Sequence, residues 1–181
     1  MKILKDDLEF LSKLANEFFA QEDIVYKLNK FSENKISGWE IWLQVEFAIF
    51  LFSHPDVSEI EREKRYELDK RRSKDKYICS IDFMIRQKYK QSSIPLEIKQ
   101  HENASNCIRY MLKDIEKYEK IKESKASTGR SLWCLGLHPT VEEDYLSKLI
   151  NENKFREIYP ELVFSKSIKG TNFSFTLGLT H

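Results

Sequence analysis

The most constraining feature of this sequence is a pair of short apolar segments, residues 77–85 and 93–99, separated by a short polar loop. Both segments are rich in residues that favour β-strands, and the loop is short enough for an antiparallel hairpin. Each segment nevertheless contains a carboxylate, Asp82 in the first and Glu97 in the second. Ionised carboxylates are almost never buried without a partner. These two residues are therefore expected to pair, to be neutralised or to bind a cation.

The rest of the chain alternates between helical and strand patterns. Apolar residues recur at spacings of three and four over 3–20 and 103–122, which predicts helices. The long apolar segment at 39–52 contains no turn residues and is also read as a helix, as are 23–31 and 141–152. Residues 59–66, 132–137, 162–168 and 173–179 read as strands, and Lys169-Gly170 as the turn of a C-terminal β-hairpin. The helix over 39–52 is expected to be buried on most sides. The order predicts a mixed α/β fold.

The 181 residues fit one domain, because domains typically contain about 100–200 residues. We expect a single domain over 1–181, with an N-terminal helical extension at 1–36, a core at 39–137, and a C-terminal helix and strands at 141–181.

The net charge of +1 conceals an uneven distribution. Residues 1–60 contain 6 basic and 11 acidic residues, residues 61–130 contain 19 and 12, and residues 131–181 contain 5 and 6. Salt screens charges beyond about 8–10 Å, so a polyanion responds to the local patch. Near-neutrality therefore does not exclude a nucleic-acid partner, although solvated charge runs are also common.

The three cysteines, at positions 79, 107 and 134, fit no disulfide or zinc spacing and are read as reduced thiols. Acidic residues occupy the N-terminal segment where a signal peptide needs apolar ones, and the longest apolar run is too short to span a bilayer. We therefore expect a cytoplasmic protein without a membrane partner.

Glu97 and Lys99 are two residues apart on a strand and point to the same face, away from Leu96 and Ile98. If the two strands pair, Asp82 reaches that face too. Two carboxylates and an ammonium suit Mg²⁺-dependent phosphodiester hydrolysis. The chain contains four acid-x-Lys triplets, about as many as its composition predicts, but only this one lies in an apolar strand that follows another strand with an Asp.

A further carboxylate interrupts the apolar helix over 39–52, and there are two candidates. Glu40 and Glu46 are six residues apart, so they face about 120° apart and only one is expected to point inward. We favour Glu46, because its neighbours are apolar, whereas Glu40 lies near the helix start, where the dipole alone favours an acid.

A helix with an internal Glu, strands that contain Asp82 and Glu97-Ile98-Lys99, and then a helix and a strand together resemble the PD-(D/E)XK nuclease superfamily. The resemblance covers about 39–137, with Ile81 in place of the family's proline. It implies a restriction-endonuclease-like mixed β-sheet flanked by helices. It also implies a Mg²⁺-dependent nuclease, in which Mn²⁺ substitutes and endonuclease cleavage is favoured over exonuclease cleavage. The metal ligands it implies are Asp82, Glu97, the backbone carbonyl of Ile98, and Glu46, with Lys99 serving the attacking water.

The expected partner is nucleic acid, DNA rather than RNA. Its phosphates would be contacted by Arg71, Arg72, Lys74, Arg109 and Lys113, which bring affinity without sequence information. A homodimer is possible, since two active sites would allow double-strand cleavage. Two alternatives stay open: a non-catalytic nucleic-acid- or protein-binding module on the same fold, and a structural domain whose Asp82 and Glu97 pair with arginines.

Overall fold

The computed structural model describes residues 1–67, 78–118, 130–152 and 160–178. The helices are α1 (Lys2–Phe19), α2 (Glu22–Glu33), α3 (Glu40–Ser53), α4 (Ala104–Tyr118) and α5 (Glu143–Glu152), with a short 3₁₀ turn at Pro160–Leu162. The strands are β1 (Val57–Glu67), β2 (Ile78–Gln87), β3 (Ile94–Gln100), β4 (Trp133–Pro139), β5 (Val163–Ser167) and β6 (Phe173–Gly178). The order of elements agrees with the sequence patterns.

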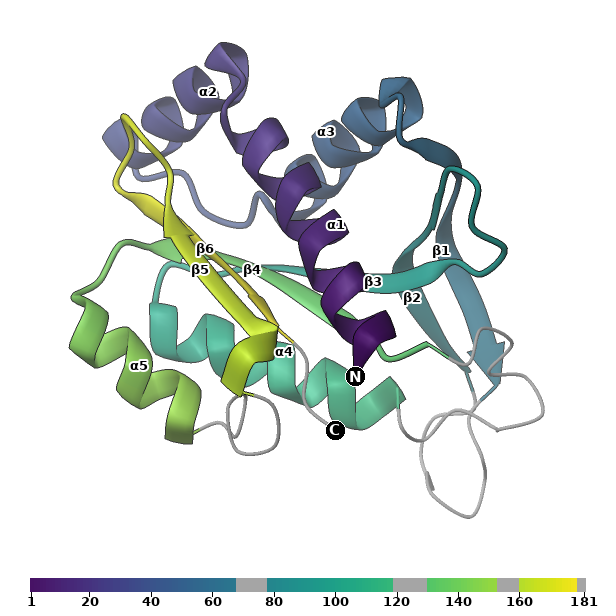
Figure 1. Ribbon diagram of the computed structural model, residues 1–181. Helices are drawn as coiled ribbons and strands as arrows, with labels where there is room; N and C mark the ends of the chain where they lie inside the picture. Colours follow the sequence, from purple (N-terminus) through teal and green to yellow (C-terminus); the bar gives the residue numbers. More distant parts are fainter. Residues whose placement is uncertain (68–77, 119–129, 153–159, 179–181) are drawn as a thin grey trace.

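The six strands form one mixed sheet in the order β1-β2-β3-β4-β6-β5. Neighbouring strands are antiparallel except β3 and β4, which are parallel and are connected through α4. Strands β5 and β6 form the expected C-terminal hairpin, and Gly170 in its turn adopts a φ of 80°, a left-handed conformation that glycine tolerates best. The fold is therefore α/β, with a mixed sheet flanked by helices (Figure 1).

Helices α1, α2 and α3 cover one face of the sheet, and α4 and α5 cover the other (Figure 1). The segment expected as an extension is part of the main hydrophobic core: Leu14 and Phe18 of α1 are fully buried. Phe19 stacks on Phe175 of β6, with ring centroids 5.0 Å apart. Helix α1 therefore helps to hold the sheet together.

On the other face, α4 packs closely against β3 and β4. Gly136 of β4 makes this approach possible, because a Cβ at this position would collide with Met111 and Cys107 of α4. Gly136 is also the register partner of Lys99 on β3. The glycine therefore brings α4 close to the strand that contains the candidate site.

Helix α3 is not buried on most sides, contrary to the expectation from its sequence. Leu43, Phe47 and Leu51 face the core and are at most 1% exposed. Four large apolar side chains face away from it: Ile41, Val45, Ile49 and Phe52. Apolar composition alone does not distinguish a buried helix face from an exposed one. Among the described helices, α3 included, none combines the length and apolar character needed to cross a membrane.

Candidate active site

Strands β2 and β3 separate at the candidate site. They pair from Ile85 opposite Ile94 to Phe83 opposite Leu96, and the next opposed residues are Asp82 and Glu97. Here the carboxylate of Asp82 replaces the backbone partner: its Oδ2 accepts a hydrogen bond of 2.8 Å from the Ile98 N–H. The register thus sets the two carboxylates side by side, as the hairpin pattern predicts.

Glu97 is the most unusual ionisable group of this cluster, because its side chain is only 5% exposed. Burial raises its pKa, and the neighbouring Asp82 raises it further through charge repulsion and a hydrogen bond between the two carboxyls, to about 9. Without a cation beside it, Glu97 is therefore protonated at neutral pH and shares a hydrogen bond with Asp82.

Lys99 lies between two carboxylates from different helices. Its Nζ is 3.4 Å from Glu40 Oε1 on α3 and 3.1 Å from Asp114 Oδ2 on α4, the second being an ion pair without hydrogen-bond alignment. Burial alone would lower the pKa of Lys99, but Asp114 and Glu40 outweigh it and hold the pKa above its ordinary value. Lys99 is therefore a fixed ammonium group near neutral pH.

The structure brings Glu40, not Glu46, to this cluster, which corrects the preference drawn from the sequence. Glu40 lies in the first turn of α3, beside the end of β3, where its Oε2 also accepts a 3.0 Å hydrogen bond from the Gln100 N–H. Glu46 faces α2: its Oε1 lies 2.6 Å from Lys27 Nζ and accepts a 3.0 Å hydrogen bond from Trp42 Nε1. Glu46 therefore lies against α2 and not over the ends of the strands, although its neighbours in the sequence are apolar.

Asp114 was not anticipated from the sequence, although a signal was present. It lies three residues after Met111 and four before Tyr118, both of which belong to the buried side of α4. An acid at helical spacing among buried residues needs a partner. Here that partner is Lys99, on the strand before the helix.

Among the described residues of the cluster, a single lysine is thus surrounded by four carboxylates, those of Glu40, Asp82, Glu97 and Asp114. Raising the pKa of Glu97 is one way to relieve this excess of negative charge, and a bound cation is another. In the described ranges, no group of three or more His, Cys, Asp and Glu side chains is placed to hold a metal ion. Asp82 and Glu97 still fit Mg²⁺, which takes one or two carboxylates and keeps several waters.

The alternative of arginine partners finds no support in the described residues, where no ion pair joins Asp82 or Glu97 to an arginine. The positive charge of Lys99 lowers the pKa of Glu97, but by less than burial and Asp82 raise it.

The expected phosphate contacts are only partly placed. Arg71, Arg72 and Lys74 lie outside the described residues. Arg109 and Lys113 are exposed on α4 and both lie against the ring of Tyr110, with their charged groups 5.4 and 5.2 Å from its centroid. The ring of His101, two residues after Lys99, lies 5.5 Å from the same ring. This basic and aromatic surface adjoins the end of β3.

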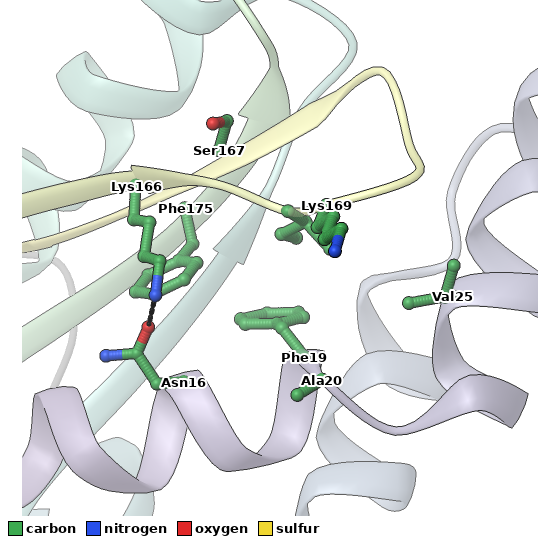
Figure 2. Close-up of a pocket in the computed structure, with 9 residues that line it drawn as sticks. Asn16, Phe19, Ala20, Val25, Lys166, Ser167, Lys169 and Phe175 are labelled. Carbon is green, nitrogen blue, oxygen red and sulfur yellow. Dashed lines mark hydrogen bonds between the residues drawn. The ribbon is translucent and has the colours of Figure 1, made fainter.

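One further candidate feature, a pocket, lies away from this cluster. A surface pocket of about 210 Å³ opens between α1 and the β5–β6 hairpin, where Phe19 and Phe175 form an apolar floor and Lys166 donates a 2.8 Å hydrogen bond to Asn16 Oδ1 (Figure 2). This pocket contains no carboxylate and is smaller than most ligand pockets, which measure about 300–1,000 Å³.

Two cysteines lie beside the cluster: Cys134 is the register partner of Glu97, and the Cys107 Sγ lies 3.9 Å from the Lys99 carbonyl oxygen. Cys107 and Cys134 are free and buried, and burial raises the pKa of the Cys107 thiol to about 12. Neither thiol is a nucleophile at neutral pH.

Comparisons of the chain with protein-family models, curated proteins and solved structures found no match.

Proposed function

We propose that this protein is a Mg²⁺-dependent nuclease of the PD-(D/E)XK type, on a restriction-endonuclease-like fold, that hydrolyses phosphodiester bonds. The observation that supports this most is the side-by-side placement of Asp82 and Glu97 where β2 and β3 separate, with the ammonium of Lys99 two residues further along β3. Pairing, neutralisation and metal binding are the three ways to accommodate such carboxylates. The excess of carboxylates over basic groups disfavours pairing; Glu97 is neutralised in the metal-free protein, and a bound cation would replace its proton.

Asp82, Glu97 and the carbonyl of Ile98 would hold the ion. When bound, Mg²⁺ would make a water molecule more acidic and offset negative charge on the phosphate. Mn²⁺ is expected to substitute for it.

Lys99 would act as a hydrogen-bond donor and not as a base, because its raised pKa keeps all three protons on Nζ. From that position it can orient the attacking water and stabilise negative charge that develops on a phosphate oxygen. Glu40 and Asp114 would hold Nζ in place and would not touch the substrate.

Nucleic acid would approach along α4, where Arg109 and Lys113 project beside Tyr110. Arginine and lysine at such positions contact phosphates, and an aromatic ring can stack on a base. DNA is the substrate we test first, with RNA as the comparison.

The experiment is a cleavage panel over single- and double-stranded DNA and RNA, with Mg²⁺, Mn²⁺ or a chelator. We expect metal-dependent cleavage that falls at least about 100-fold in Lys99→Ala, the cost of losing one charge-stabilising donor. Lys148→Ala is the matched control, because Lys148 is an exposed lysine on α5.

Undiminished cleavage by Lys99→Ala would contradict the assignment of the site. If every substrate stays intact at every metal concentration while an oligonucleotide still shifts in a gel, the chain is a non-catalytic nucleic-acid-binding module.

A further inference from the structure

We propose that the pocket between α1 and the β5–β6 hairpin binds a small organic anion with a compact apolar body, of the class of aromatic carboxylates. The pocket lies beside α1, on the face of the sheet opposite to α4 (Figures 1 and 2). None of the residues that line it belongs to the carboxylate cluster. The proposal therefore goes beyond the nuclease activity and does not depend on it.

The floor of the pocket is apolar. Phe19 of α1 and Phe175 of β6 stack there with ring centroids 5.0 Å apart, and Ala20, Val25 and Ile168 complete the apolar lining. Covering this floor with an apolar group is favourable, because it removes the surface from water. An aromatic ring can also pack on the two phenylalanine rings in an offset or edge-on arrangement. The floor therefore fits the apolar part of a ligand.

The charged groups of the pocket are all positive. Lys166 and Lys169 line it, no Asp or Glu does, and within the described ranges neither lysine forms an ion pair. Lys166 donates one hydrogen bond, to the neutral amide oxygen of Asn16, although an ammonium group carries three donors. The Ser167 hydroxyl points away from Phe19 (Figure 2). Two ammonium groups with donors to spare fit an anion.

Two hydrogen bonds hold the walls of the pocket in place without a ligand. On one side Lys166 of β5 is bonded to Asn16 of α1. On the other, Asn29 Nδ2 of α2 donates a 2.9 Å hydrogen bond to the Gly170 carbonyl oxygen in the hairpin turn. A preformed pocket loses little free energy to reorganisation when it binds.

The size of the pocket restricts the ligand to a small molecule. Its volume of about 210 Å³ equals that of roughly seven water molecules, at about 30 Å³ each. A nucleotide is too large to be enclosed, whereas one ring with a short carboxylate arm fits. Phenylacetate is therefore the probe we choose.

The test is a titration of the full chain with phenylacetate, followed by NMR of the isotopically labelled protein. We expect signal shifts centred on Ala20, Val25 and Lys169, with a Kd on the order of 1 mM, as the efficiencies of small ligands imply. Phenylacetamide keeps the shape and lacks the charge, so it should bind at least about tenfold more weakly. Inorganic phosphate keeps the charge and cannot cover the floor, so it should also bind more weakly.

Variants test the two parts of the pocket separately. The double variant Lys166→Gln/Lys169→Gln should weaken phenylacetate binding at least about tenfold, because both ammonium groups are lost. Lys148→Gln is the matched control and should bind normally, since Lys148 is an exposed lysine on α5. Ala20→Leu places a larger side chain at an exposed position of the lining and should block the site.

The comparison of ligands uses the natural chain and is therefore independent of how the variants fold. The absence of shifts tenfold above the expected Kd, or shifts centred on Arg109 and Lys113 instead, would overturn the proposal. Binding of phenylacetamide or phosphate as tight as that of phenylacetate would do the same. So would undiminished binding by the double lysine variant or by Ala20→Leu.

Discussion

The raised pKa of Glu97 makes metal binding depend on pH in a way that can be calculated. A metal ion needs both Asp82 and Glu97 ionised, but without metal the pKa of Glu97 is about 9. Two pH units below that value only about 1% of the group is ionised. The apparent affinity for Mn²⁺ or Mg²⁺ should therefore rise about tenfold per pH unit, or about 100-fold between pH 6 and pH 8, and level off above about pH 9. Each ion bound near neutral pH should release about one proton.

Calorimetric titration of the protein with Mn²⁺ measures both quantities. The apparent enthalpy in buffers with different ionisation enthalpies gives the number of protons released, and titrations at several pH values give the slope of the affinity. Glu97→Gln should abolish the proton release and weaken binding. Metal binding with no proton release and with an affinity independent of pH would refute the reasoning, since it would mean that Glu97 is already ionised or is not a ligand.

The metal-free protein provides a second readout of the same group. The folded-state pKa of Glu97 lies above its usual value of 4.5, so its contribution to stability is complete at low pH and is lost as pH rises towards about 9. Each pH unit within that window changes the free energy of unfolding by about 1.4 kcal/mol, or about 3 kcal/mol between pH 6 and pH 8. Urea denaturation of the natural chain and of Glu97→Gln, both with chelator, should show this decline in the first and its loss in the second.

Three further outcomes follow from the contacts around the site. Glu40→Gln should lower metal-dependent cleavage about 10- to 100-fold, as losses of orienting partners do. Glu46→Gln loses only the contact with Lys27 and should leave cleavage unchanged. Equal effects of the two variants on cleavage would contradict the geometry. Asp114→Asn should lower the pKa of Lys99, which a shift of the alkaline limb of the pH–rate profile to lower pH would reveal. Gly136→Ala should cost about 1–3 kcal/mol of stability, measured by urea denaturation, because the added methyl collides with α4; an unchanged midpoint would show that α4 can move away freely.

The sequence predicts the centre of this site well because the residues that form it are close together in the sequence. Asp82 and Glu97 come together through a hairpin, whose register follows from the apolar pattern and a short loop. The same applies to Lys99, which shares a strand face with Glu97. The helices and strands were equally predictable, because the spacing of their apolar residues is clear.

The sequence predicts the surroundings of the site poorly, because they depend on how helices dock. Whether Glu40 or Glu46 reaches the strand end depends on where α3 crosses the sheet, which no local pattern specifies. Asp114 reaches Lys99 only because Gly136 allows α4 to approach. The outer face of α3 was expected to be buried, because an apolar composition does not distinguish a helix face that packs on the core from one that is exposed.

The hydrogen bond from the Ile98 N–H to Asp82 gives this residue two separate tasks. Its negative charge belongs to the chemistry of the cluster, but its oxygen also substitutes for the strand partner that β3 lacks at this point. Asp82→Ala would remove both, and a buried N–H left without an acceptor costs about 1–3 kcal/mol, so lost activity in that variant would be confounded with a weakened sheet. Asp82→Asn keeps an oxygen acceptor and removes only the charge. Asp82→Asn is therefore the variant from which the role of the charge in catalysis can be inferred. In Asp82→Ala, a loss of activity would also reflect weaker pairing of β2 and β3.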